Sequence, residues 1–81
     1  MKVKIKLYAT LRSRAPVEVG IGEAFELNVD NDTNIVDLLT KLNITDEDVK
    51  IVMVNGESVD DLQKSLKSED LVVIFPPVGG G

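Results

Sequence analysis

The sequence predicts one small α+β domain, in which one main helix packs on one face of a mixed sheet of four to five strands. The chain has 81 residues, which is enough for a single hydrophobic core. Its apolar residues are mainly aliphatic, with 12 valines, 6 isoleucines and 9 leucines, and β-branched residues favour strands. Apolar positions alternate with polar ones near the N-terminus but recur at helical spacing in only one segment.

The N-terminal third is predicted to form a hairpin of two strands. Residues 2–8 alternate apolar side chains with lysines and a tyrosine, which is typical of a half-buried strand with a basic outer face. Residues 9–16 fit one short helical turn that ends before the proline, and glycines 20 and 22 mark a turn. Residues 25–29 alternate again, so we expect this second strand to pair with the first.

The main helix is predicted to begin just after Asn34. The Asn34 side chain can accept a hydrogen bond from a free backbone amide of the first turn, and Asp37 occupies the third helical position, as in a capping box. Asn43 is a plausible left-handed stop. The apolar residues fall on one face, which should lie across a sheet: Ile35, Leu38, Leu39 and Leu42.

The C-terminal half is predicted to add three strands. Residues 50–54 form the third strand, and Asn55-Gly56 is the strongest hairpin signal in the chain because both residue types tolerate positive φ. Residues 58–59 begin a short return strand, and residues 60–66 fit a short helix or 3₁₀ turn. Residues 71–75 are apolar on both sides, which indicates a central strand.

The predicted order of elements is that of the ubiquitin-like β-grasp fold. The first and last strands would pair in parallel at the centre of the sheet, which the right-handed crossover rule permits. We therefore divide the chain into a β-grasp domain, residues 1–75, and an extended, flexible C-terminal tail, residues 76–81.

Composition excludes several function classes. The net charge is −5, from 9 basic and 14 acidic residues, so we expect no nucleic acid and no anionic membrane as partner, but a protein with a basic docking face. Histidine and cysteine are absent, which excludes zinc sites, thiol nucleophiles and imidazole bases; we predict no metal site. The N-terminal residues do not resemble a secretory signal, and we expect a cytoplasmic protein.

The tail is the one feature that the core does not explain. Two prolines favour extended geometry, at about 3.1 Å per residue, so the six-residue tail would hold the terminal carboxylate roughly 20 Å from the sheet. Glycines have no side chain and can thread a narrow channel. We interpret the α-carboxylate of Gly81 as the reactive group; a frayed terminus or a cloning remnant is the alternative. The residues that would thread are Pro76, Pro77, Val78, Gly79 and Gly80.

The chemistry expected of a terminal carboxylate is activation by adenylation. ATP-dependent adenylation would convert the poorly electrophilic carboxylate into an acyl-adenylate. A sulfur donor would then displace AMP and leave a thiocarboxylate, whose sulfur is a good nucleophile.

Residues 75–81, Phe-Pro-Pro-Val-Gly-Gly-Gly, resemble the C-terminus of the ubiquitin-like sulfur carriers, and most closely the small subunit of molybdopterin synthase. The resemblance spans most of the chain in order, through Tyr8–Arg12, Asn34–Leu39 and Val54–Glu57. The loop of residues 13–22 fits no pattern of the family, and residues 60–66 are slightly expanded.

The resemblance implies a carrier protein and not an enzyme. Gly81 would be adenylated and then carry sulfur, and Gly80 would be its threading neighbour. The implied partners are an E1-like adenylating enzyme, which uses ATP and Mg, a sulfur donor protein, and a large synthase subunit that takes the sulfur for the dithiolene of molybdopterin. The chain itself would bind no cofactor. A thiamine-pathway sulfur carrier, a ubiquitin-like modifier conjugated through Gly81 and a plain interaction module remain as alternatives.

A partner-binding surface is predicted on the face of the sheet opposite the helix. If the even-numbered residues of the last strand point into the core, its odd-numbered residues point outward, beside the polar residues of the first strand. An apolar and aromatic patch next to the tail is a suitable docking surface. Its predicted members are Leu71, Val73, Phe75, Lys4, Lys6 and Tyr8.

Overall fold

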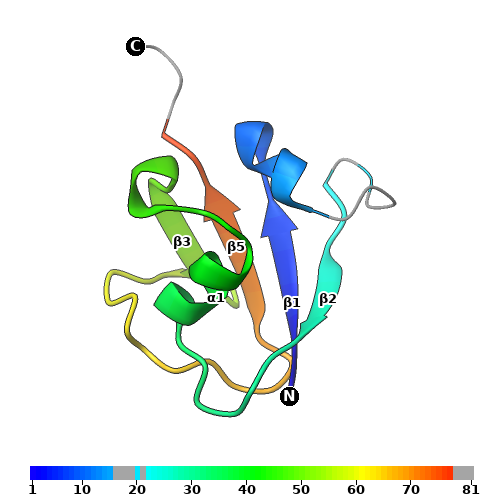
Figure 1. Cartoon of the computed structure of the whole chain (residues 1–81), viewed down its shortest axis with the longest axis vertical. Helices are drawn as coiled ribbons and strands as arrows, with labels where there is room; N and C mark the ends of the chain where they lie inside the picture. Colours follow the sequence, from blue (N-terminus) through cyan, green and yellow to red (C-terminus); the bar gives the residue numbers. More distant parts are fainter. Residues whose placement is uncertain (16–19, 21, 78–81) are drawn as a thin grey trace.

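The computed structural model describes residues 1–15, 20 and 22–77, which form a five-stranded mixed sheet with helical segments on one face (Figure 1). The sheet order is β2-β1-β5-β3-β4, which confirms the predicted β-grasp fold. The elements are β1 (Lys2–Leu7), the 3₁₀ helix η1 (Ala9–Arg14), β2 (Phe25–Asn28), α1 (Ile35–Lys41), the 3₁₀ helix η2 (Asp46–Asp48), β3 (Ile51–Val54), β4 (Glu57–Ser58) and β5 (Leu71–Phe75).

The first and last strands lie together at the centre of the sheet, as predicted. β1 pairs with β5 in parallel, and Lys4 lies opposite Leu71. β2 pairs antiparallel with the free side of β1, and β3 pairs antiparallel with the free side of β5. β5 therefore has a strand on each side and is the central strand that its apolar sequence predicted. Its even-numbered residues are buried, and its odd-numbered residues are half-buried.

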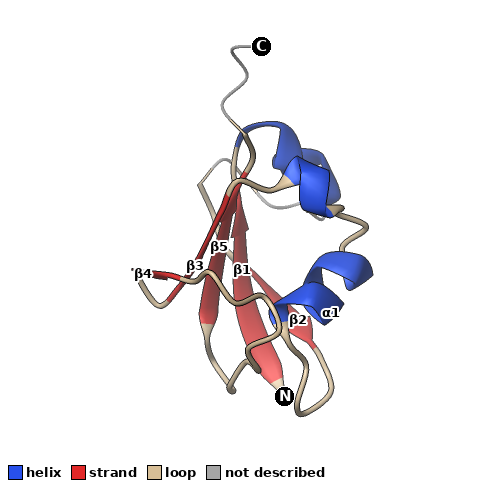
Figure 2. Ribbon diagram, turned by 90° about the vertical axis from the view of Figure 1, so that its left-hand side faces the viewer, coloured by secondary structure: helices blue, strands red, loops and turns tan. Residues whose placement is uncertain are grey.

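The core lies between the sheet and α1. Figure 2 shows the helical segments on one side of the sheet, and no helix formed by the described residues lies on the opposite face. Ile5, Val72 and Ile74 on the sheet and Ile35 and Leu38 on α1 are each 0% exposed. Burying a side chain of this size contributes about 1.5–3 kcal/mol to the free energy of folding, so these contacts fix α1 on this face.

A capping box begins α1 at the predicted residue. The backbone amide of Asp37 donates to Oδ1 of Asn34 at 2.7 Å, and the Asn34 amide donates to the Asp37 carboxylate at 3.4 Å. At the other end Asn43 has φ +60 and its amide donates to the carbonyl of Thr40. Both predicted ends of the helix are thereby confirmed.

The turn between β3 and β4 also organises the start of β5. Asn55 and Gly56 have φ +53 and +86, the left-handed pair that the sequence predicted. Beyond that prediction, Oδ1 of Asn55 accepts the Leu71 amide at 2.9 Å, and its Nδ2 donates to Asp70 at 2.9 Å. One asparagine therefore connects the hairpin to the first residue of the central strand.

Residues 60–66 form no helix, but the predicted turn is present, because the Lys64 amide donates to the Asp61 carbonyl at 3.2 Å. The end of the segment lies against the beginning of α1: Ser65 forms an isolated bridge with Asn34, and the Leu66 amide donates to the Thr33 carbonyl at 2.8 Å. The Leu62 carbonyl accepts the Val36 amide at 3.0 Å. Because these backbone groups bond to another element, they are not free for bonds within a local helix.

The strand boundaries differ by one residue from the predictions. The first two strands end one residue earlier than predicted, at Leu7 and Asn28, the third strand begins at Ile51, and the return strand is Glu57–Ser58. The sequence did not predict η2, which follows Thr45. The Thr45 amide and hydroxyl both donate to the Asp48 carboxylate, at 3.2 and 2.9 Å. These hydrogen bonds stabilise the charged form and lower the pKa of Asp48 below its usual value.

We expect Asn34→Ala to lower the free energy of unfolding by about 1 kcal/mol, because the Asp37 amide loses its acceptor. Urea unfolding monitored by circular dichroism measures this change. Asn31→Ala is the matched control, since Asn31 lies exposed in the preceding turn and not at the cap. Equal effects of the two substitutions would show that the cap contributes nothing specific.

Candidate functional site

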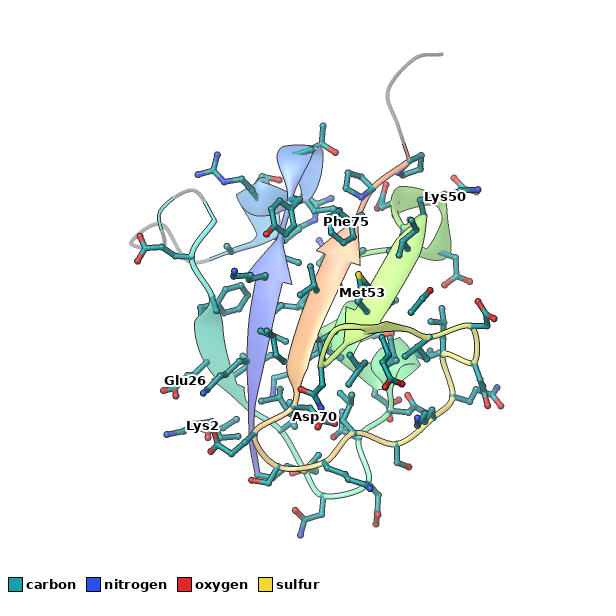
Figure 3. The ribbon with its side chains drawn as sticks, turned by 180° about the vertical axis from the view of Figure 1, so that it is seen from behind. Lys2, Glu26, Lys50, Met53, Asp70 and Phe75 are labelled. Carbon is teal, nitrogen blue, oxygen red and sulfur yellow. The ribbon has the colours of Figure 1, made fainter. Side chains whose placement is uncertain are left out.

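The outer face of the sheet carries a continuous row of apolar side chains. Strand alternation sends the odd-numbered residues of β5 to this face, and the pairing of Met53 with Val73 and of Ile51 with Phe75 brings β3 residues beside them. Figure 3 shows Phe75 and Met53 on this side of the sheet. We call this row the outer apolar stripe: Tyr8, Ile51, Met53, Leu71, Val73 and Phe75.

An aromatic stack forms the end of the stripe nearest the C-terminus. The rings of Tyr8 and Phe75 lie parallel, with centroids 4.9 Å apart and an interplanar angle of 10°. Ile51, opposite Phe75, is 43% exposed, although it is a large apolar residue. Both rings are half-buried, so the stack presents an aromatic surface that a partner can cover.

The same end of β5 is the root of the tail. The Phe75 carbonyl accepts the Lys50 amide at 2.8 Å, and the Ile74 carbonyl accepts the Tyr8 amide at 3.3 Å. The sheet therefore holds the strand from both sides up to its last residue. Pro76, half-buried, and Pro77, exposed, follow; having no amide hydrogen, neither can continue the ladder. The predicted threading residues Val78, Gly79 and Gly80, and the predicted reactive residue Gly81, lie outside the described residues.

Lysines of β1 flank the stripe on one side. Lys2 Nζ lies 3.6 Å from Glu26 and Lys4 Nζ lies 3.8 Å from Glu69; Figure 3 shows Lys2 and Glu26 side by side. Lys6 lies opposite Val73, and within residues 1–15, 20 and 22–77 no carboxylate lies within 4.0 Å of its amine. Three lysines therefore face two carboxylates on this flank, which leaves it with a small excess of positive charge.

The predicted surface residues fall together, and two more join them. Leu71, Val73 and Phe75 share the outer face with Lys4, Lys6 and Tyr8, as the alternation predicted, and are half-buried rather than fully exposed, apart from Lys4, which is exposed. Their role in binding stays a prediction. Ile51 and Met53 were missed, because Ile51–Val54 is apolar at every position and only the pairing register shows which residues face outward.

Other sites for chemistry are sparse in the described part of the chain. No group of three or more His, Cys, Asp or Glu side chains there could hold a metal ion. A pocket of about 440 Å³ lies between the β3–β4 hairpin and residues 59–70, and its lining includes Ile35, Leu66, Lys64 and Asp61.

None of the helices in the described part of the chain has the length and apolarity needed to cross a membrane.

Comparison with known proteins adds a family match over most of the chain. The model of the ThiS family matches residues 5–81, which include the tail. Among curated proteins, no sequence is significantly similar to the chain.

Solved structures share the fold over nearly the whole chain. SAMP1, the small archaeal modifier protein 1 of Haloferax volcanii, is 26% identical with a TM-score of 0.68 and full coverage of both chains. A putative molybdopterin converting factor subunit 1 from Pyrococcus furiosus is 26% identical with a TM-score of 0.70, covering 95% of this chain and 98% of that one. A third structure is a complex of subunits 1 and 2 of the molybdopterin-converting factor from Helicobacter pylori. One of its chains shares the fold, with 21% identity, a TM-score of 0.63 and full coverage of both chains.

We expect a double-mutant cycle on Tyr8→Ala and Phe75→Ala to give a coupling energy of about 0.5–1.5 kcal/mol, because either substitution alone removes the aromatic stack. Urea unfolding of the four proteins measures it. Tyr8→Phe is the control: it keeps the ring, so its free energy of unfolding should stay near that of the wild type. Additive effects of the two alanine substitutions would contradict a stabilising stack.

Proposed function

The chain belongs to the ThiS family, and from this we propose that it is a sulfur carrier whose reactive group is the α-carboxylate of Gly81. At the coarser level it is a ubiquitin-fold protein of the class that comprises sulfur carriers and modifiers. One observation carries the finer proposal: the family match runs through the Pro-Pro-Val-Gly-Gly-Gly tail to residue 81.

The proposed reaction takes place in two steps on the carboxylate. First, a carboxylate oxygen of Gly81 attacks the α-phosphorus of ATP, and pyrophosphate leaves with the electron pair of the broken P–O bond. Second, hydrosulfide supplied by a sulfur donor protein attacks the acyl carbon, the bond between that carbon and the AMP oxygen breaks, AMP leaves with the electron pair, and a thiocarboxylate remains. ATP and Mg would bind to an E1-like adenylating enzyme, so the chain serves as carrier and not as enzyme, and needs no cofactor of its own.

The geometry of the described residues suits such a carrier. The sheet holds β5 up to Phe75 through hydrogen bonds on both sides, and the outer apolar stripe ends at that residue. A partner that covers the stripe would therefore contact the root of the tail as well. The prolines that follow favour extended geometry, about 3.1 Å per residue, which would carry the terminus away from the docked surface.

We further propose that the destination of the sulfur is molybdopterin and that the chain acts as the small subunit of molybdopterin synthase. Its Phe-Pro-Pro-Val tail and its likeness to the Pyrococcus furiosus converting factor subunit support this role. The Helicobacter pylori protein of the same fold was solved with a second subunit. The partners would then be a large synthase subunit, the adenylating enzyme and the sulfur donor.

Two alternatives share the activation step. The likeness to SAMP1 over the whole of both chains favours a protein modifier joined to target lysines through Gly81. The name of the matching family favours a sulfur carrier of the thiamine pathway. The three roles differ in what receives the activated carboxyl group: a large synthase subunit, a lysine or the thiamine pathway.

Intact mass spectrometry tests the reaction. After incubation with the adenylating enzyme from the same genome, ATP, Mg and a sulfur donor, we expect the chain to gain the mass of one sulfur in place of one oxygen. Covalent conjugates without this gain would support the modifier. An unchanged mass with a demonstrably active enzyme would contradict both roles.

Deletion of Gly80 and Gly81 should abolish adenylation, because it removes the reactive carboxylate, and should leave the free energy of unfolding unchanged, because the buried core is built from residues between Val3 and Ile74. One alanine added after Gly81 should have the same effect, since the carboxylate is displaced by one residue. Pyrophosphate release measures adenylation, and an alanine added before Met1 is the control. Normal adenylation of both tail variants would contradict the proposed role of Gly81.

Phe75→Asp should weaken binding to the adenylating enzyme by about 2 kcal/mol, a loss typical of a buried interface aromatic. Val36→Asp is the matched control, because Val36 is an apolar residue 38% exposed on the helix. Binding by biolayer interferometry, with urea unfolding of both variants, separates docking from stability. Equal affinity of the two variants would show that the outer apolar stripe is not the docking surface.

A further inference from the structure

The charge on the outer face is opposite in sign to the charge of the whole chain. The net charge is −5, which predicted a partner with a basic docking face. The strand residues that face outward, however, include Lys2, Lys4 and Lys6 and one acidic residue, Glu26. Glu69, in the turn before β5, lies 3.8 Å from Lys4 and adds a second carboxylate, so the lysines still outnumber the acidic residues on this flank. The acidic turns Asp30–Asp32 and Asp46–Asp48 belong to other parts of the described structure.

These lysines lie on one flank of the stripe. They follow β1, whereas on the β4 side Ser58 pairs with Met53. Along β1 and β5, Lys4 lies opposite Leu71 and Lys6 lies opposite Val73. The face is therefore apolar along β5 and β3 and cationic along β1, and its two flanks are electrostatically different.

Much of this cationic flank is available to a partner. The ion pairs of Lys2 and Lys4 are long, at 3.6 and 3.8 Å, and the lysine side chains are each 46% exposed. Exposed pairs of this kind contribute about 0–1 kcal/mol, so a carboxylate of a partner can replace them at little cost. Lys6 has no such pair within the described part of the chain.

We propose that the adenylating enzyme docks on this face with carboxylates placed over Lys4 and Lys6, beside an apolar pocket for the outer apolar stripe. This inference rests on the proposed function, because it names the chemistry of the partner surface at that same site. Complementary charge accelerates association and fixes the orientation of a complex. Apolar contacts are non-directional, so the stripe orients a partner mainly through its shape. The lysines add a charged contact on one flank only, and so help to fix on which side of the partner Phe75 and the tail root lie.

Binding kinetics with the adenylating enzyme of the same genome test this inference. We expect the double variant Lys4→Glu, Lys6→Glu to reduce the association rate constant about 10-fold at low ionic strength, and the difference to shrink in 1 M salt, where charges are screened beyond about 3 Å. Lys64→Glu is the control, a lysine beside the start of α1 that lines the 440 Å³ pocket. The milder double variant Lys4→Gln, Lys6→Gln guards against misfolding and should reduce the rate less.

The outcomes separate this inference from the proposed function. If Phe75→Asp weakens binding while both lysine variants associate like the wild type or faster, the acidic partner surface is refuted and the docking face stands. If the lysine variants and the Lys64→Glu control slow association equally, the effect is one of net charge and the inference also fails. If the wild-type chain does not bind the adenylating enzyme, both the inference and the proposed function are overturned.

Discussion

The parallel pairing of β1 with β5 is the interaction on which the rest of the structure depends. These strands come from the two ends of the folded domain, and their pairing places both at the centre of the sheet. It also fixes the two faces, because the register that buries Ile5 beside Val72 sends Lys6 and Val73 outward together. A shift of one residue would exchange the faces and expose the core.

This pairing also determines where chemistry can take place. The root of the tail is the end of β5, and the same strand carries half of the outer apolar stripe. The tail root and half of the proposed docking surface thus belong to one strand whose position the sheet defines. The proposed carrier needs no catalytic side chain, because its fold supplies a surface and a fixed point of exit.

Charge is distributed on a finer scale than the composition indicates. A net charge of −5 is a property of the whole chain, but a partner senses the charges within about 10 Å of its own surface, since salt screens the rest. On the outer face those charges are the three β1 lysines and the two carboxylates beside them, Glu26 and Glu69. The expectation of a basic partner rests on the net charge of the whole chain, which does not distinguish the separate faces of the folded domain. For a domain of this size, the sign of one face is a better guide to a partner than the net charge.

The sequence by itself determined the local features and indicated the family. The capping box at Asn34 and Asp37, the Asn55-Gly56 turn and the alternation of β1 depend on contacts between residues a few positions apart, and all three were predicted correctly. The tail, too, can be recognised from the sequence, because it is a motif of consecutive residues.

Only the tertiary structure decided how distant segments meet. It placed Ile51 and Met53 on the outer face, set Ser65 and Leu66 against the beginning of α1, and gathered the β1 lysines on one flank of that face. Each of these depends on register or on hydrogen bonds between segments far apart in the chain. A strand that is apolar at every position, such as Ile51–Val54, has no alternation in its sequence that shows which side faces outward. Residues 60–66 are polar apart from two leucines, and nothing in this local sequence shows that their backbone bonds to α1.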